Sequence, residues 1–274
     1  MRHQSGRAVH LQHRFVTDDE TVLTPASVVV AVTREGRTDP EVQGSATPVG
    51  DAFAFAAGPL PEGAYSVLWD GGATARDTAL LEVVGGVLVT VADVRADPEL
   101  PADRWDAATV VDARERVTTE FERITGRAFV PRTRTVPVTV ADGCPVWLPF
   151  RDVLSVEVRD DTGTVVPDVM SESVGPLTTV SGLDSGTYAV DVRFGFGAVP
   201  DDIRGAALLR IRSLLFAGAS SIPDRATSFQ PAEGGTYRLA TAGMRGSETG
   251  IPDVDAVLAR YRLSVLDDMV GVAF

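Results

Sequence analysis

The stretch "TYAVDVRFGFGAVPDDIRGAALLRIRSLLF", residues 187–216, reads as a strand and a helix joined by a glycine-rich turn. Its first part is rich in valine and aromatic residues, which favour strands, and "FGFG" marks the end of that strand. Pro200 and two aspartates then stand in a first helical turn, where a missing N–H and negative charge are favourable. The helix predicted at 200–217 is apolar over more than half of its circumference, so we expect it to be largely buried. Together these elements predict an α+β fold.

Length and composition indicate a folded protein with two domains. The chain has 274 residues, 44% of them hydrophobic, and a mean hydropathy of +0.08, which suffices for a buried core. No apolar run approaches the roughly 20 residues of a membrane-spanning helix. The first residues lack the apolar stretch of a secretory signal. The single Cys144 has no partner for an internal disulfide, so we expect a cytoplasmic origin.

The charge pattern argues against a protein that grips nucleic acid. The net charge is −13, both halves of the chain are acidic, and all 25 basic side chains are arginine. A protein that neutralises phosphates shows a basic domain or stripe, which neither half has. An acidic wall repels DNA, which suits a passage and not a binding surface.

The first 95 residues predict an all-β domain. Short runs rich in valine and aromatic residues alternate with turn signals such as "PLPEG" and "DGGA". This spacing favours a small antiparallel β-sandwich over residues 1–95, and without a Cys…Trp…Cys arrangement any immunoglobulin-like character is one of architecture only. Within it, Tyr65, Val67 and Trp69 share one strand face and should belong to the core. The acidic, proline-containing stretch at 96–104 predicts a linker.

The rest of the chain, residues 105–274, predicts a second domain of helices with an inserted β-hairpin region. Its expected elements are helices at about 103–125, 200–217 and 252–266, a β region at 128–199, and a long loop at 218–250. A loop of this length inside a compact domain indicates a function or a partner. The first and second helices should pack together through Val110, Val117, Phe121 and Ile124 on one side and Ile203, Leu208 and Ile211 on the other.

Catalytic and metal-binding patterns are weak. The three histidines, His3, His10 and His13, precede the first predicted strand, where they are poor candidates for a catalytic base or a metal site. Paired aspartates such as Asp160–Asp161 and Asp201–Asp202 fit a turn and a helix start. The glycine-rich stretches match neither a phosphate loop nor a dinucleotide fingerprint. We therefore expect no catalytic residue, no metal and no cofactor.

The densest basic region contains Arg123, Arg127, Arg132 and Arg134. One interpretation is a contact with an acidic neighbour or with DNA. The other is a solvated helix end and loop, because arginine is favourable near a helix C-terminus.

The second half contains three segments in a recognisable order: "VTTEFERITGRAF" (117–129), "YAVDVRFGFGAVPDDIRGAALLRIRSLL" (188–215) and "TGIPDVDAVLARYR" (249–262). Together they resemble the head-to-tail connector proteins (adaptor or head-completion proteins) of long-tailed bacteriophages. The resemblance covers about residues 100–265. The strand "GAYSVLWDGG" in the first domain resembles immunoglobulin-like modules that precede connector domains in some phages.

This resemblance implies a structural virion protein and no enzyme. Adaptors of this kind form a homo-oligomeric ring beneath the portal, for which matching the portal suggests twelve subunits. They bind the portal protein on one side and a stopper or tail protein on the other, and DNA passes through their channel without sequence-specific binding. The implied location is the virion neck at the portal vertex, after assembly in the host cytoplasm, with no membrane.

Pattern and resemblance together select candidate contact residues and leave a second function open. The candidates for inter-subunit or partner contacts are Arg127, Arg132, Tyr237, Arg238, Tyr261 and Arg262. The alternative is an immunoglobulin-like module of a virion that binds carbohydrate or a host surface. A place in the particle next to the portal favours the adaptor, and a place at the tail tip favours the binder.

Overall fold

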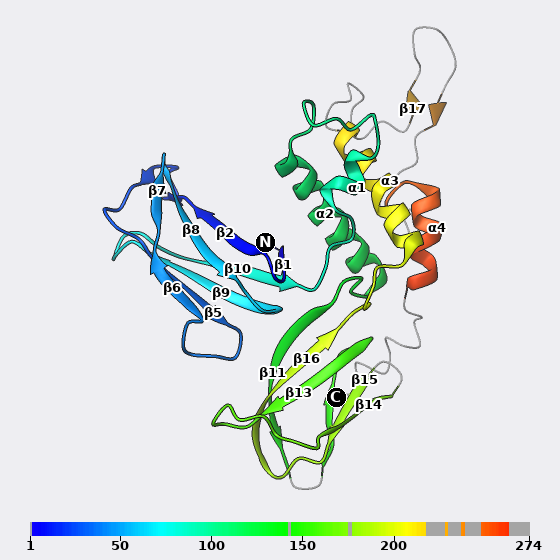
Figure 1. Cartoon of the computed structure of the whole chain (residues 1–274). Coiled ribbons are helices and arrows are strands. Elements are labelled where there is room, and N and C mark those ends of the chain that lie inside the picture. The colour runs from blue at the N-terminus through cyan, green and yellow to red at the C-terminus, as the bar shows by residue number, and fades with distance from the viewer. Residues whose placement is uncertain are drawn as a thin grey trace. The chain divides into compact units, whose positions relative to one another are not determined.

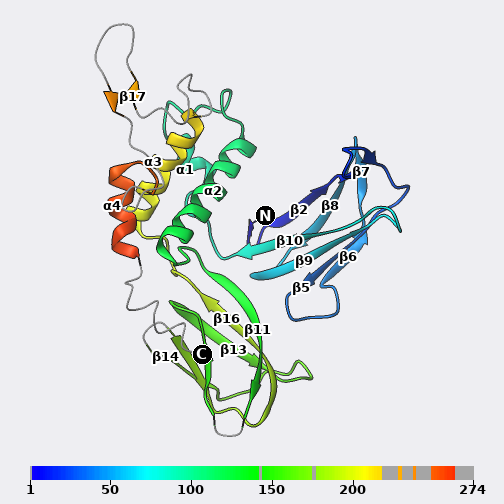
Figure 2. The same ribbon diagram turned by 180° about the vertical axis from the view of Figure 1, so that it is seen from behind.

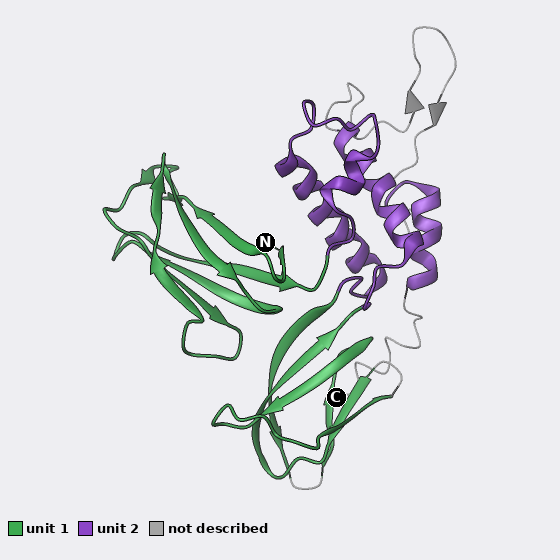
Figure 3. Cartoon of the chain, viewed as in Figure 1, with its two compact units in different colours: residues 1–86, 131–195 green, residues 87–130, 196–274 purple. Residues whose placement is uncertain are grey.

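The computed structural model describes residues 2–141, 144–174, 177–217, 228–229, 237–238 and 248–262. Strands and helices occur in separate regions, which confirms the α+β class (Figures 1 and 2). Contacts divide the chain into two units, residues 1–86 with 131–195 and residues 87–130 with 196–274 (Figure 3). No described helix has the length and apolar character needed to cross a membrane.

The N-terminal part of the first unit is a β-sandwich, as predicted. One sheet has the order β1 (Arg2–Gln4), β10 (Arg76–Val84), β9 (Gly63–Asp70), β5 (Val29–Arg34) and β6 (Val42–Ser45). The other has the order β2 (Ala8–His13), β8 (Ala52–Pro59) and β7 (Thr47–Val49), and a small hairpin joins β3 (Phe15–Val16) to β4 (Val22–Leu23). Both sheets contribute to one core, in which Tyr65, Val67 and Trp69 are buried from one face of β9. The immunoglobulin-like character of this sandwich stays a prediction.

The predicted β region is a second pair of sheets with its own core. One has the order β11 (Arg132–Val140), β16 (Gly186–Phe194) and β13 (Val153–Arg159), and the other β12 (Val146–Leu148), β15 (Leu177–Ser181) and β14 (Met170–Val174). Alternate valines such as Val158, Val190 and Val192 fill the space between them. This region is therefore larger than the inserted hairpin expected from the sequence.

The two β regions form one unit because a polar face of the β11–β16–β13 sheet meets the sandwich. Arg193 donates to both carboxylate oxygens of Glu62, at 2.8 and 3.1 Å. Arg134 donates to Glu82 at 3.1 Å. These charged contacts join residues far apart in the sequence, so hydrophobic patterning did not predict them. The contact division consequently cuts across the domains predicted at 1–95 and 105–274, and the predicted linker at 96–104 lies inside the helical unit.

The described residues of the second unit form four helices: α1 (Val91–Arg95), α2 (Ala107–Thr125), α3 (Asp201–Ala217) and α4 (Pro252–Tyr261). Helix α1 lies in a stretch where no helix was predicted, and Thr90 and Asp93 form a capping box at its start. Helix α2 was predicted at about 103–125, with Asp103 or Asp106 as possible caps; it begins at 107, because Asp106 accepts the backbone N–H of Thr109 as its N-cap.

The last predicted helix is shorter than expected. Helix α4 ends at Tyr261 and not at 266, since Arg262 has extended backbone angles. Residues 263–266 of the predicted helix and most of the predicted loop at 218–250 lie outside the described residues.

The expected packing of α2 on α3 is confirmed. Val110, Val117, Phe121 and Ile124 are buried on α2, and Ile203 and Ile211 are fully buried on α3, while Leu208 is half-buried. Helix α3 is less enclosed than predicted, because Leu209 is 49% exposed.

Candidate functional site

An aromatic cluster lies where three distant segments of the helical unit meet. Phe129 stacks on Phe196 with ring centroids 5.5 Å apart, and Tyr261 meets both rings edge-on at 5.6 and 5.8 Å. Phe129 is fully buried. A backbone hydrogen bond from Phe196 N–H to the Ala128 carbonyl, 3.1 Å long, joins two of the segments directly. Edge-on and stacked rings stabilise such a junction beyond the area they bury.

The hydroxyl of Tyr261 ties α4 to the start of α3. It donates to Oδ1 of Asp202 at 2.8 Å, and Arg260 pairs with Oδ2 of the same carboxylate at 3.0 Å. Burial, and then the hydrogen bond to Asp202, raises the pKa of Tyr261 above its usual value. The phenol therefore stays a neutral donor throughout the physiological range.

The start of α4 is held by a buried carboxylate. Oδ1 of Asp255 accepts the backbone N–H of Thr249 at 2.9 Å and its hydroxyl at 2.8 Å. Both residues are less than a tenth exposed. Gly250, between Thr249 and the helix, has a positive φ of 76°, and Pro252 occupies the first helical turn. The role of Asp255 was not predicted from the sequence.

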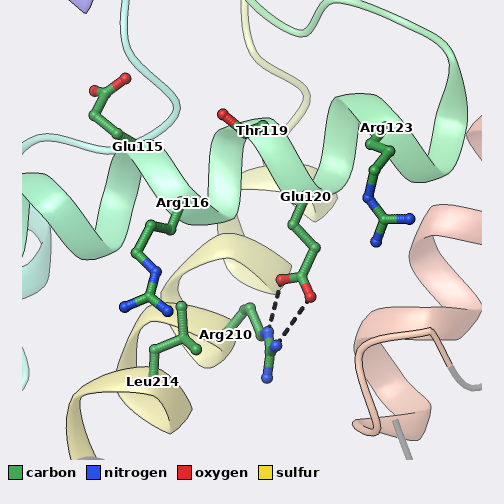
Figure 4. Close-up of a pocket in the computed structure, with 7 residues that line it drawn as sticks. All are labelled: Glu115, Arg116, Thr119, Glu120, Arg123, Arg210 and Leu214. Atoms are coloured by element: carbon green, nitrogen blue, oxygen red, sulfur yellow. Dashed lines mark hydrogen bonds and ion pairs between the residues drawn. The ribbon is translucent and has the colours of Figure 1, made fainter. Parts of the chain in front are cut away.

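A bidentate ion pair joins helices α2 and α3 and borders a groove. Arg210 on α3 donates to both carboxylate oxygens of Glu120 on α2, at 2.8 and 2.9 Å. Figure 4 shows this pair beside a groove of about 470 Å³ between the two helices. Its lining residues are Glu115, Arg116, Thr119, Glu120, Arg123, Arg210 and Leu214. Of these, Arg116, Thr119 and Arg123 are exposed.

Two arginines hold the segment between α1 and α2 through hydrogen bonds and ion pairs. Arg95 donates to the carbonyl oxygens of Leu100 and Pro101 at 2.7 and 3.0 Å. Arg212 on α3 pairs with Asp97 at 2.9 Å and also with Glu99. The segment predicted as a linker is thus a fixed part of the helical unit.

Two of the predicted contact residues in the helical unit pack against the aromatic cluster or close to it. The guanidinium of Arg127 lies 4.8 Å from the centre of the Phe196 ring. Arg262 donates to the carbonyl oxygen of Ile124 at 3.3 Å and pairs with Glu248. Arg127, Tyr261 and Arg262 therefore lie close together, although they were selected from the sequence as separate candidates.

The other predicted contact residues lie elsewhere. Arg132, at the start of β11, has its Nε 3.7 Å from Glu82, and its side chain is 13% exposed. Tyr237 and Arg238 form β18 and pair with β17 (Ser228–Phe229), but their side chains lie outside the described part of the chain. Whether any of the six residues touches a partner stays a prediction.

Sequence reasoning missed Phe196 and the Glu120–Arg210 pair. Phe196 was assigned to the end of a strand because "FGFG" is a turn signal, and its aromatic partners lie far away in the sequence. The Glu120–Arg210 pair left no signal, because the contact depends on how two helices face each other. The preserved order of three resemblance blocks was the one clue that these segments meet.

Titratable residues in the described part of the chain show no cluster typical of a metal site. Within the described ranges, no group of three His, Cys, Asp or Glu side chains could hold a metal ion. His13 stacks on Trp69 at 5.2 Å, and its Nε2 is 3.3 Å from Asp77, so it belongs to the sandwich.

No family model matches the chain, and no curated protein matches it either. Among solved structures, the chain is similar to the neck of an empty GTA particle computed with C6 symmetry, with 17% identity, a TM-score of 0.38, and coverage of 65% of this chain and 90% of that chain. It is also similar to Dpr2 Ig1-Ig2 in complex with DIP-Theta Ig1-Ig3, with 10% identity, a TM-score of 0.21, and coverage of 72% of this chain and 52% of that chain. Both likenesses are too low to carry an argument.

Proposed function

We propose that this chain is a structural adaptor of a phage-like virion neck. It forms a ring of identical subunits beneath the portal, joins the capsid to a stopper or tail protein, and catalyses no reaction. Its role is to hold neighbours in place while DNA passes through the axial channel.

The proposal rests on the three sequence segments that contribute the rings of the aromatic cluster. Phe129 comes from the first resemblance block, Phe196 from the second and Tyr261 from the third. The same three blocks supply α2, α3 and α4 of one unit. These segments were chosen from the sequence alone, and their aromatic residues Phe129, Phe196 and Tyr261 are at least 65 positions apart. They nevertheless form one packed structure, as a resemblance to a single domain family requires.

The charge of the chain supports a channel more than a DNA-binding site. A net charge of −13 repels the phosphate backbone at every separation within a Debye length, about 8 Å at physiological salt. A channel wall that bound phosphates would hold the DNA in transit. Partners should therefore be proteins: the portal, a stopper or tail protein, and further copies of this chain, for which twelve copies would match a portal.

The proposal is tested by deleting residues 249–274 in the virion's own genome. The deletion removes α4 and Tyr261, so the expected particles are DNA-filled heads that leak or lack tails, counted by electron microscopy. A copy of the full gene supplied in trans should restore tailed particles. Normal tailed particles from the deletion would refute the adaptor assignment. Normal tails with lost adsorption to the host would support the surface-binding alternative.

A further inference from the structure

Charged side chains form the contact between the β-sandwich and the second β region, the two parts of the first unit (Figure 3). Glu62 of the sandwich accepts two hydrogen bonds from Arg193, at 2.8 and 3.1 Å. Further ion pairs of this contact are Arg134–Glu82 at 3.1 Å, Arg132–Glu82 at 3.7 Å, Arg134–Glu35 at 3.8 Å and Arg34–Asp191 at 3.8 Å. In all but the last of these, a carboxylate of the sandwich faces an arginine of the second region. We call this set of side chains the charged joint.

The two hydrophobic cores of the first unit are separate. Trp69 and Val83 belong to the core of the sandwich, whereas Val158 and Val190 belong to the core of the second region. Among the described residues, each core contains residues of one β region only. Burial of apolar surface is the main force that fixes one folded part on another, and parts joined without it are expected to move relative to each other.

The covalent path between the two β regions leaves room for such a motion. The sandwich ends at Gly86 and the second region begins at Pro131, and residues 87–130 between them belong to the helical unit. The N–H of Gly85 donates to the carbonyl oxygen of Pro131 at 2.8 Å, so the end of one region lies beside the start of the other. Gly85 and Gly86 carry no side chain and can absorb a change in backbone angles. They are therefore suited to act as a pivot.

Two opposing effects determine how strongly the closed joint is favoured. The side chains of Glu82 and Asp191 are 15% and 12% exposed, so closing the joint removes most of their hydration. The side chain of Arg193 stays 41% exposed, and ion pairs with this much exposure contribute little net stability. An open arrangement, in which water hydrates these groups again, is therefore close to the closed one in free energy.

We propose that the charged joint opens about Gly85 and Gly86 while both β cores stay folded, and that ionic strength sets the balance between the closed and open arrangements. Salt shortens the Debye length from about 10 Å at 0.1 M to about 3 Å at 1 M and so weakens the attraction across the joint. The apolar cores do not depend on that attraction. The joint is a property of the chain itself and does not depend on a role in a virion neck.

A distance measurement in the full-length chain tests the proposal. Cys144→Ser removes the native thiol, and Thr38→Cys with Asp161→Cys places one spin label on an exposed site of each β region. Pulsed electron paramagnetic resonance should show a longer distance population that grows with salt. Its ratio to the short one should rise at least about tenfold between about 0.05 and about 1 M NaCl. One unchanged distance distribution at all salt concentrations would overturn the proposal.

Hydrogen exchange distinguishes an opening joint from an unfolding region. The backbone amides of Val67 and Val190, at the centres of the two cores, should exchange equally slowly at low and high salt. Faster exchange of either amide, in step with the growth of the longer distance, would contradict the proposal, because the cores would then open with the joint.

Charge reversal tests the joint residue by residue. Glu62→Arg places two positive charges together and should raise the longer distance population at low salt, and adding Arg193→Glu should restore the closed arrangement with the charges exchanged. Asp51→Arg is the matched control, because it makes the same change in charge and breaks the exposed Arg14–Asp51 pair inside the sandwich, 3.0 Å long. It should leave the distances unchanged. Identical distances in the Glu62→Arg variant and the unsubstituted labelled protein would refute the role of the charged joint.

Discussion

Phe129→Leu should weaken the packing of the aromatic cluster in the helical unit without creating a large cavity. The ring is fully buried, and it stacks on Phe196 at 5.5 Å and meets Tyr261 at 5.6 Å. Leucine keeps an apolar side chain but loses both ring contacts, each of which contributes about 0.5–1.5 kcal/mol. The expected loss in the free energy of unfolding is therefore about 1–3 kcal/mol, against about 3–5 kcal/mol for alanine.

Native-state hydrogen exchange measures this loss element by element. Amides of α2, α3 and α4 should exchange faster by a factor that matches the loss, while those of the β-sandwich keep their rates. Phe150→Leu is the matched control, because Phe150 meets Phe194 at 4.8 Å in the other unit and should affect only that unit. Unchanged exchange in α4 of the Phe129→Leu variant would show that the cluster does not hold the three blocks together.

Three further perturbations test separate contacts. Glu120→Gln leaves Arg210 without its charged partner and should lower the free energy of unfolding in urea by about 1–3 kcal/mol. The double replacement Glu120→Leu with Arg210→Met should recover most of that loss. Equal losses in the single and the double variant would contradict the pairing. Gly36→Ala should destabilise the first unit, because φ of Gly36 is +76° and a new Cβ would lie 2.8 Å from Cγ2 of Thr135. Adding Thr135→Ser removes that methyl group and should recover part of the lost stability. No recovery would argue against the clash. Burial raises the pKa of Tyr65 to about 12, so the neutral phenol stabilises the fold fully below pH 10, and this contribution is lost as the pH rises toward 12. Tyr65→Phe should therefore flatten the pH dependence of the free energy of unfolding, measured in urea, between pH 10 and 12.

The sequence predicted those features that depend on local pattern. Pro200 and the two aspartates that follow it predicted α3 within one residue of its observed start, and Gly126 ends α2 in the left-handed conformation typical of a glycine at a helix end. The alternation of Tyr65, Val67 and Trp69 predicted one face of the sandwich. Each of these signals lies within a few residues of the structure that it specifies.

The features that were missed depend on contacts between distant segments. The two-sheet core of the second β region needs paired residues as far apart in the sequence as Arg132 and Phe194, and the ion pairs of Arg193 and Arg134 join it to the sandwich. Charged residues at such a contact have the same composition as a solvated surface, so hydrophobic patterning cannot distinguish the two. Tyr261 and Arg262 were selected as contact residues, but their partners Asp202 and Ile124 could not be found without the fold.

The central claim is that this chain forms a ring in the neck of a virion. An electron cryo-microscopy map of the intact particle, resolved at the portal vertex, tests it most directly. The account predicts a closed ring of copies of this chain between portal and tail, with the helical unit containing Phe129, Phe196 and Tyr261 next to the DNA channel. A neck fully explained by other proteins, with this chain at the tail tip or on the capsid surface, would contradict it.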